Sequence, residues 1–327
     1  MHRTVAGSIL LRMASHPLVL QTEELDPAPA TWLHERARLV RSGEGDANYA
    51  ALLAEADAFI VRTYTKVNDA LLAEAPRVKV VGRAGVGLDN IDLEACRRRG
   101  VRVVHTPDAN SQAVVEFVWS LVFDALRPRL FLSEALDKKR WGETRKELRA
   151  RRQVCDCVLG VFGMGRIGRR VARVGASLGM RVLYHDLLDV PVGERSGATP
   201  VSRDELLRQS DILTIHVDDR PSNRGIVNGA AFALLKPDVV FINAARGFLV
   251  DAAACADFFI KHPAATAMLD VHEPEPFGPT YPLLDIKNVH LSPHIAAATD
   301  AAQVNMSWVV RDVWRVLNNE EPQFAAV

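Results

Sequence analysis

Residues 158–186 read VLGVFGMGRIGRRVARVGASLGMRVLYHD and decide how the second half of the chain folds. An apolar run over 158–162 is followed by GMGRIG (163–168), then by a helical pattern over Arg169–Leu178, and finally by a second apolar run that ends at Asp186. This order of strand, glycine-rich turn, helix and strand predicts a dinucleotide-binding βαβ unit. A glycine turn of purely structural origin is the alternative, and the acidic residue after the second run speaks against it.

Each glycine of the 163–168 fingerprint has a separate physical task. Gly163 allows the tight turn, Gly165 allows the backbone to approach a pyrophosphate, and Gly168 allows the helix to pack close to the strand. The N-terminus of the helix offers unpaired N–H groups and partial positive charge to the phosphates. Asp186 can accept hydrogen bonds from both ribose hydroxyls and would repel a 2′-phosphate. The fingerprint therefore predicts NAD rather than NADP as the cofactor.

Further apolar runs around this unit predict the rest of its sheet. They lack the polar–apolar alternation of half-exposed strands, as expected for strands that helices cover on both faces. Six such strands suffice for a doubly wound Rossmann sheet. The predicted strands are Cys157–Phe162, Arg181–His185, Ile212–Val217, Val239–Asn243, Thr266–Leu269 and Val289–Leu291.

The first part of the chain also alternates short apolar runs with helical patterns such as Tyr49–Glu55 and Asn68–Ala75, which predicts a second parallel α/β sheet. Between the two series lies Ser111–Leu126, a helical segment that is apolar on most sides and hence buried on most sides. We expect it to pack between domains or against another subunit, and we expect a homodimer through this region. The predicted strands of the first part are Pro17–Gln21, Arg38–Val40, Ala58–Arg62, Val78–Gly82 and Val101–His105.

The composition excludes several classes of protein. A chain of 327 residues, 48% of them apolar, is long enough for two globular domains. Forty basic and forty acidic residues leave no net charge that would favour nucleic acid or a membrane surface, and the basic run Lys138–Arg152 is expected to be a solvated surface helix. Four cysteines are too few for a disulfide framework. We expect a cytoplasmic protein whose first sixteen residues are an extension without a cleavage pattern.

Three residues beyond the fingerprint have the chemistry that a nicotinamide cofactor requires. Arg246 follows an expected strand, and a guanidinium there can hold a carboxylate and polarise the adjacent carbonyl group. Glu275 and His294 can meet if two successive strand ends bring them together. A carboxylate bonded to one imidazole nitrogen makes the other nitrogen an acid or base near neutral pH. A metal site is the weaker alternative, because prolines interrupt the segment that carries the carboxylates, and no metal is expected.

Four separated motifs, GMGRIG (163–168), NAARG (243–247), LDVHEPEP (269–276) and SPH (292–294), resemble the D-isomer-specific 2-hydroxyacid dehydrogenases. The resemblance implies that Arg246, Glu275 and His294 form the catalytic set. It also implies which residues contact the cofactor beyond the three glycines and Asp186. These are Arg166 and Ile167 at the pyrophosphate, Asp270 at the nicotinamide end, and Val217, Ala244 and Ala245.

The first domain resembles the phosphoglycerate dehydrogenase branch of this family, through the stretches FIVRTYTKVN (59–68), VVGRAGVGLDNIDLEA (80–95) and HTPDANSQAVVEF (105–117). The resemblance implies a substrate site whose members are Arg62, Val86, Gly87 and Asn110. The backbone N–H groups of the glycine-rich loop would bind the substrate carboxylate. Arg62, Lys66 and Arg83 are the cations available for a phosphate tail.

Three positions depart from the family pattern. Asp108 stands beside the expected anion site, where a carboxylate would oppose a phosphate. The loop VDDRPSN (217–223) has Asp218 in place of a proline, so the edge of the cofactor site is expected to differ. Phe248 replaces a glycine after NAARG and could crowd the site.

The resemblance implies two doubly wound domains with a cleft between them. The flavodoxin-like substrate domain is expected over residues 1–110, completed by 298–327 with a C-terminal helix over Val304–Leu317, and the Rossmann NAD-binding domain over 111–297. The expected reaction exchanges hydride between NAD and C2 of a small D-2-hydroxy acid, with 3-phosphoglycerate as the favoured substrate. A glyoxylate, hydroxypyruvate or general 2-oxo acid reductase is the alternative. An NAD(H)-sensing corepressor-like binding protein is a second alternative.

Overall fold

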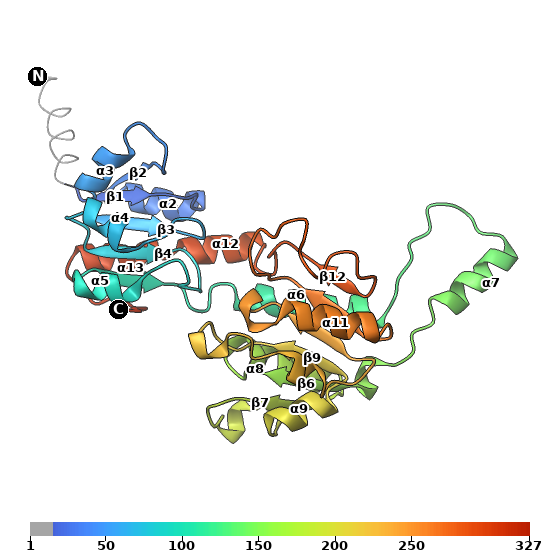
Figure 1. Cartoon of the computed structure of the whole chain (residues 1–327). Coiled ribbons are helices and arrows are strands. Elements are labelled where there is room, and N and C mark those ends of the chain that lie inside the picture. Colours follow the sequence, from blue (N-terminus) through green and yellow to red (C-terminus); the bar gives the residue numbers. More distant parts are fainter. Residues whose placement is uncertain (1–15) are drawn as a thin grey trace, which may run out of the picture. The chain divides into compact units, whose positions relative to one another are not determined.

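The computed structural model describes residues 16–327, and these form two compact α/β units (Figure 1). One unit runs up to Asn110 and resumes over Ala298–Val327, and the other comprises Ser111–Ala297. Each unit contains one parallel sheet with helices on both faces, which confirms the predicted doubly wound fold. Residues 1–15 of the expected N-terminal extension lie outside the described part of the chain. Within residues 16–327 no helix is long and apolar enough to cross a membrane.

Five strands form the sheet of the first unit. They are β1 (Leu18–Gln21), β2 (Arg38–Arg41), β3 (Ala58–Val61), β4 (Val80–Arg83) and β5 (Arg102–His105). Their order, β2-β1-β3-β4-β5, is the flavodoxin-like order. The helices of this unit are α2 (Pro27–His34), α3 (Tyr49–Glu55), α4 (Asp69–Glu74), α5 (Leu93–Arg98), α12 (Asp300–Ser307) and α13 (Val310–Leu317).

Alternate side chains of these strands enter two separate cores, because successive residues of a strand point to opposite faces. On β3, Phe59 and Val61 pack with α3, α4 and α5, whereas Ala58 and Ile60 pack with α2 and α13. Both faces are apolar, so the strands show no alternation in sequence.

The C-terminal helix predicted over Val304–Leu317 is wrong as a single helix. The structure has two helices there, and α12 begins earlier, where the Thr299 hydroxyl accepts a hydrogen bond from the Ala302 N–H group. The backbone N–H groups of Trp308 and Val309 bond to carbonyl groups three residues back. The backbone there forms a tight turn of the 3₁₀ type between the two helices. The tight turn directs α13 along β4 and β5, and periodicity alone does not reveal such a break.

Seven strands form the sheet of the second unit. They are β6 (Val158–Phe162), β7 (Arg181–His185), β8 (Thr199–Pro200), β9 (Ile212–Ile215), β10 (Val240–Asn243), β11 (Thr266–Leu269) and β12 (Val289–Leu291). Their order, β12-β11-β10-β9-β6-β7-β8, is the Rossmann order extended by one strand. The sequence did not predict β8, because an edge strand of two residues leaves no apolar run.

Helices cover both faces of this second sheet. The helices of this unit are α6 (Ser111–Leu126), α7 (Lys138–Glu147), α8 (Arg166–Ser177), α9 (Arg203–Gln209), α10 (Gly229–Phe232) and α11 (Ala252–Lys261), of which α7 lies away from the sheet (Figure 1). The first and third, α6 and α8, pack together on one face, and α9, α10 and α11 share the core of the other. The helix over Ser111–Leu126 has the predicted bounds, whereas α7 is shorter than the basic run that predicted it.

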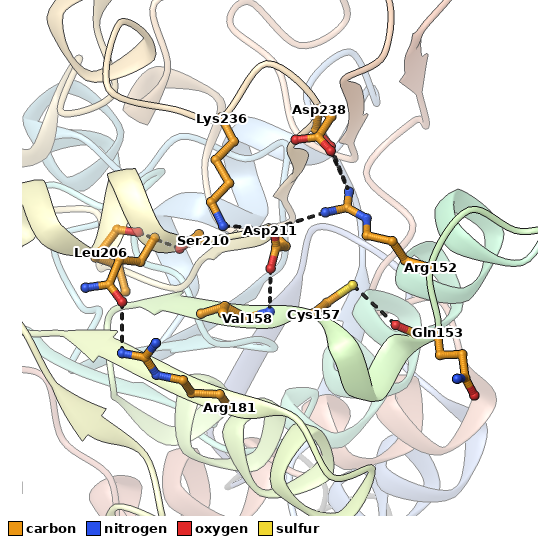
Figure 2. Close-up of polar contacts among 11 residues, drawn as sticks. Arg152, Gln153, Cys157, Val158, Arg181, Leu206, Ser210, Asp211, Lys236 and Asp238 are labelled. Atoms are coloured by element: carbon orange, nitrogen blue, oxygen red, sulfur yellow. Dashed lines mark hydrogen bonds and ion pairs between the residues drawn. The ribbon is translucent and has the colours of Figure 1, made fainter.

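Asp211 ties together three segments at the amino ends of β6, β9 and β10 (Figure 2). Its carboxylate accepts hydrogen bonds from the Val158 N–H group at 2.7 Å, from Arg152 at 3.0 Å and from Lys236 at 2.9 Å. Arg152 also donates to the Asp238 carbonyl group at 3.0 Å. Burial raises the pKa of Asp211, but these donors outweigh it and the net pKa lies below its ordinary value.

We predict that Asp211→Asn lowers the free energy of unfolding by about 2 kcal/mol at neutral pH, because two cations lose their anionic partner. Since the folded-state pKa is depressed, the contribution is present above the unfolded pKa of about 4 and is lost as the pH falls through the folded value. Urea titrations of wild type and variant at several pH values measure the difference. Asp189→Asn, at a highly exposed carboxylate paired with Arg195, is the control and should cost under about 1 kcal/mol. If the variant's loss of unfolding free energy stayed the same in acid, the stabilising role of the Asp211 carboxylate would be contradicted.

Candidate active site

Three neighbouring parallel strands end at one edge of the second unit's sheet and bring the expected catalytic residues together. In the register of the sheet, Asn243 at the end of β10 lies beside Leu269 at the end of β11, and Leu269 lies beside Leu291 at the end of β12. Each strand continues into a loop that carries one expected catalytic residue. The loops share an edge because the carboxyl ends of parallel strands do so.

His294 and Glu275 form a hydrogen-bonded pair at this edge. The imidazole Nδ1 of His294 donates to Glu275 Oε2 at 2.7 Å, and the other carboxylate oxygen accepts from the His272 N–H group at 2.6 Å. The bond to Glu275 raises the pKa of His294, aided by the charges of Glu275 and Asp270 and opposed by burial and by Arg246. Burial raises the pKa of Glu275, but the two hydrogen bonds outweigh it and the net pKa is lowered. The pair therefore leaves Nε2 of His294 to exchange a proton.

Asp270 is fully buried directly after β11, and its carboxylate holds the loop that carries His294. It accepts hydrogen bonds from the Ser292 hydroxyl at 2.6 Å and from the N–H groups of Ile295 and Ala296 at 2.9 and 2.8 Å. The His294 N–H group donates to the Asp270 carbonyl at 2.8 Å. Asp270 thus positions the loop, and its place at the nicotinamide end, which the family resemblance implies, stays a prediction.

Arg246 follows β10 and is positioned by a short network of its own loop. The Asn243 side chain donates to the Arg246 carbonyl at 2.9 Å and accepts from the Ala245 N–H group at 3.1 Å. The positive charge of Arg246 opposes the rise in the pKa of His294. The next residue, Gly247, packs so closely on the His272 backbone that an added Cβ atom would lie 2.0 Å from its carbonyl carbon. Only glycine fits at that position.

The glycine fingerprint forms the turn between β6 and α8 that the sequence predicts. Gly163 has φ +98°, and an added Cβ atom there would lie 2.6 Å from the His216 carbonyl carbon. At Gly168 an added Cβ atom would lie 2.0 Å from the Gly163 carbonyl oxygen, since α8 packs directly on the turn. At Gly165 it would meet no atom within 4 Å. The turn is therefore closed toward the protein and open above Gly165.

The N-terminus of α8, where Arg166 and Ile167 form the first turn, has no side-chain cap. Helix N-terminal N–H groups need a partner, and a phosphate is a suitable one. Asp186 lies beyond the end of β7, where its Oδ2 accepts from the Met164 N–H group at 2.6 Å and its Oδ1 from the Leu188 N–H group at 2.9 Å. The same carboxylate thus fixes the fingerprint turn, and its contact with the ribose stays a prediction.

The remaining expected cofactor residues lie at neighbouring strand ends. Val217 follows β9, and Ala244 and Ala245 follow β10; all three are half-buried. Beside them, Nε2 of His216 lies 3.0 Å from the Thr214 hydroxyl, and desolvation lowers the pKa of His216 to about 3. A neutral imidazole therefore adjoins the fingerprint turn, which the sequence analysis did not single out.

The expected substrate residues Arg62, Val86, Gly87 and Asn110 belong to the first unit, and the catalytic set belongs to the second. The Arg62 guanidinium donates to the Gln303 side chain and to the Glu24 carbonyl. Half-buried Val86 accepts a hydrogen bond at its carbonyl group from His105 at 3.0 Å. Gly87 and Asn110 are also half-buried.

Glu23 organises the loop that carries Arg62, and the sequence analysis missed it. Its carboxylate accepts hydrogen bonds from four successive backbone N–H groups, those of residues 62–65, at 2.8–3.2 Å. Burial raises the pKa of Glu23, but these donors outweigh it and the net pKa is lowered. The partners are separated by about forty residues, so no local pattern reveals the contact. This loop already holds one anion, the protein's own carboxylate.

The structure shows the surroundings of the three residues that depart from the family pattern, Asp218, Phe248 and Asp108. Asp218 closes its loop by accepting from Arg220 at 2.7 Å and from Asn223 at 2.8 Å. Phe248 packs against the core on the α11 side, and the Arg224 guanidinium lies 5.1 Å from its ring centroid. Asp108 is exposed.

Among residues 16–327, no group of three or more His, Cys, Asp or Glu side chains is arranged to hold a metal ion. His290 and His294 have the spacing that binds zinc from one face of a helix. His290, however, belongs to strand β12 and is exposed.

A family model described as the NAD binding domain of D-isomer specific 2-hydroxyacid dehydrogenases matches residues 119–296. The chain is 36% identical over 272 residues to a glyoxylate reductase of Aeropyrum pernix, covering 79% of this chain and 78% of that protein. It is also 36% identical over 292 residues to a D-3-phosphoglycerate dehydrogenase of Mycobacterium tuberculosis. That match covers 88% of this chain but only 54% of the relative, so the chain spans about half of its length.

Solved structures with a similar fold belong to the same family. A crystal structure of D-lactate dehydrogenase from Aquifex aeolicus, complexed with NAD and lactic acid, superposes with a TM-score of 0.79 at 26% identity. The match covers 93% of this chain and 96% of that one. The predicted family and cofactor are thus confirmed: the chain belongs to the D-isomer specific 2-hydroxyacid dehydrogenases, a family of NAD-dependent oxidoreductases.

Proposed function

We propose that the protein exchanges hydride between NAD and C2 of a small D-2-hydroxy acid. The observation that carries the proposal is the His294–Glu275 pair, with Nδ1 of the imidazole bonded to the carboxylate at 2.7 Å. The positive charge of Arg246 opposes the rise in the pKa of that imidazole. A proton donor or acceptor and a cation therefore lie together in the unit that binds the cofactor.

The residues around the fingerprint fit a dinucleotide. The open space above Gly165 and the uncapped first turn of α8 suit a pyrophosphate, and Asp186 suits the ribose hydroxyls. When bound, NAD supplies the hydride acceptor, and its reduced form supplies the hydride. Val217, Ala244, Ala245 and Asp270 are proposed to line the rest of the cofactor site.

His294 is the proposed acid and base. In the reductive direction Nε2 of His294 donates a proton to the carbonyl oxygen of the 2-oxo acid, and in the oxidative direction it accepts the hydroxyl proton. Glu275 stabilises the imidazolium form and orients the ring. Arg246 is proposed to hold the substrate carboxylate and polarise the adjacent carbonyl group. In the first unit, Val86, Gly87, Arg62 and Asn110 are the proposed substrate contacts.

Two substrate classes are supported by different observations. 3-Phosphoglycerate, with 3-phosphohydroxypyruvate as its oxidised partner, is supported by several relatives named D-3-phosphoglycerate dehydrogenase, and would place the protein in serine biosynthesis. An unphosphorylated acid such as glyoxylate or hydroxypyruvate is supported by the first unit. There Glu23 occupies the N–H groups of the Arg62 loop, and the Arg62 guanidinium bonds to Gln303. The four free thiols are in keeping with the cytoplasmic location that we also propose.

The catalytic proposal predicts a pH dependence. Reduction requires protonated His294, so its rate falls as the pH rises through the raised pKa of this residue, and the oxidative rate rises there. Glu275→Gln removes the cause of the raised pKa, and the alkaline limb of the reductive profile should move toward about pH 6.5, the ordinary value for histidine. At about pH 8 the variant should lose at least about tenfold in kcat. NADH oxidation with glyoxylate and with 3-phosphohydroxypyruvate measures both profiles. Coinciding profiles would contradict the role of Glu275.

We further propose a homodimer through α6 and the segment that follows it. Phe123, on α6, has an exposed side chain, and so do Leu130, Phe131, Leu132 and Trp141 beyond it. Leu130, Phe131 and Leu132 are consecutive, and exposed apolar patches mark interaction surfaces.

The dimer predicts a mass in solution twice that of one chain, which light scattering measures. Phe131→Asp should give a monomer, because Phe131 is 86% exposed in the single chain and the variant would bury a charge in the proposed interface. Ile260→Asp, which introduces the same charge at an exposed apolar residue of α11, is the control and should leave the dimer intact. A wild-type monomer, or a dimer in both variants, would contradict this interface.

A further inference from the structure

His272 contacts Glu275 and the loop that carries His294, the two members of the catalytic pair. The residue is 94% buried, and it lies two residues after Asp270 and three residues before Glu275. The proposed reaction gives its imidazole no task, and neither composition nor spacing singled it out.

Two hydrogen bonds link His272 to the two loops. Its main-chain N–H group donates to Glu275 Oε1 at 2.6 Å. Its imidazole Nε2 contacts the carbonyl oxygen of Ser292, two residues before His294, at 2.8 Å. A carbonyl oxygen only accepts, so Nε2 of His272 donates this hydrogen bond. One residue therefore binds the Glu275 carboxylate through its backbone and the His294 loop through its side chain.

Packing holds His272 in this orientation. Its ring meets Phe277 edge-to-face at a centroid distance of 4.8 Å and Tyr281 at 5.6 Å. The rings of Phe277 and Tyr281 are stacked on each other at 4.7 Å. On the backbone side, Gly247 of the Arg246 loop lies against the His272 carbonyl group. The three loops of the proposed catalytic set thus all meet at this residue.

We propose that His272 is a positioning residue that sets the distance between Glu275 and His294. The expected effect on the reaction rate rests on the proposed function. The positioning itself concerns only the geometry of the Glu275–His294 hydrogen bond. Asp270 already holds residues 292–296 against β11. The Glu275 carboxylate accepts hydrogen bonds from the His272 N–H group and from His294 itself. Without the imidazole bond to Ser292, the segment between Asp270 and Glu275 loses one of its side-chain links to the His294 loop.

The test compares side chains of different reach. His272→Gln places an amide nitrogen close to the position of Nε2 and keeps the bond to Ser292, whereas His272→Asn has the same chemistry but is too short. His272→Phe keeps the aromatic packing and removes the donor. His290→Phe, at the exposed histidine of β12, is the matched control for a histidine-to-phenylalanine exchange.

The first readout is the pKa of His294, followed by NMR titration of its imidazole in the free protein. Glu275, Asp270 and Arg246 are the charged groups that act on this imidazole, and none of them is altered in these variants. We expect the pKa to stay at its wild-type position in His272→Gln and His290→Phe. In His272→Asn and His272→Phe we expect it to fall toward the ordinary value of about 6.5, because the bond to Glu275 loosens.

The second readout is the reduction of 2-oxo acids by NADH. We expect kcat to fall about tenfold in His272→Asn and His272→Phe with little change in the KM for NADH, because a displaced acid misaligns the reaction without touching the cofactor. His272→Gln should retain most of the wild-type kcat. Equal pKa values of His294 and equal kcat values across the four variants would overturn the proposal. If His272→Phe fails to fold, the His272→Gln and His272→Asn pair decides alone.

The two proposals fail in different ways. If the wild-type protein reduces no 2-oxo acid, the proposed function fails, and the His294 titrations still test the role of His272. If the wild type is active and the titrations coincide, only the positioning role fails.

Discussion

The parallel register of β10, β11 and β12 is the constraint on which the rest of the site depends. It brings the loops after Asn243, Leu269 and Leu291 to one edge of the sheet, although the three residues of the proposed catalytic set span nearly fifty positions of sequence. Buried Asp270 then holds the His294 loop in place with three hydrogen bonds to its carboxylate. A buried carboxylate is costly unless its hydrogen bonds are made, and Asp270 makes them with the His294 loop. The fold of this segment and the geometry of the site therefore depend on each other.

The polar groups of the site have two kinds of proposed role: some take part in the reaction, and others hold those groups in position. His294, Glu275 and Arg246 are the proposed catalytic groups, and other polar groups maintain their geometry. His272 and Asp270 are such supports in the second unit, and Glu23 has the same function for the Arg62 loop of the first. In each case a hydrogen-bond acceptor or donor fixes the backbone of a loop. The loop is thereby held in one position relative to the rigid sheet.

The sequence predicted the parts of the protein that depend on local pattern. The two strand series, the Ser111–Leu126 helix and the glycine fingerprint all arise from periodicity or from glycine chemistry, and the structure contains them with small shifts at their ends. The break between α12 and α13 was not predicted, because the apolar spacing continues through it. Glu23 and Gln303 were also missed, since their partners lie at sequence separations of about 40 and 241 residues, where pattern has no reach.

The central claim is that His294 transfers the proton that accompanies hydride exchange. The most direct measurement compares wild type with His294→Asn in two assays, NADH binding by fluorescence and NADH oxidation with glyoxylate, hydroxypyruvate, pyruvate and 3-phosphohydroxypyruvate. The account predicts that the wild type reduces at least one of these acids. The variant should bind NADH with unchanged affinity and lose at least about a hundredfold in kcat. Equal loss of binding and turnover, or a variant as active as the wild type, would contradict it.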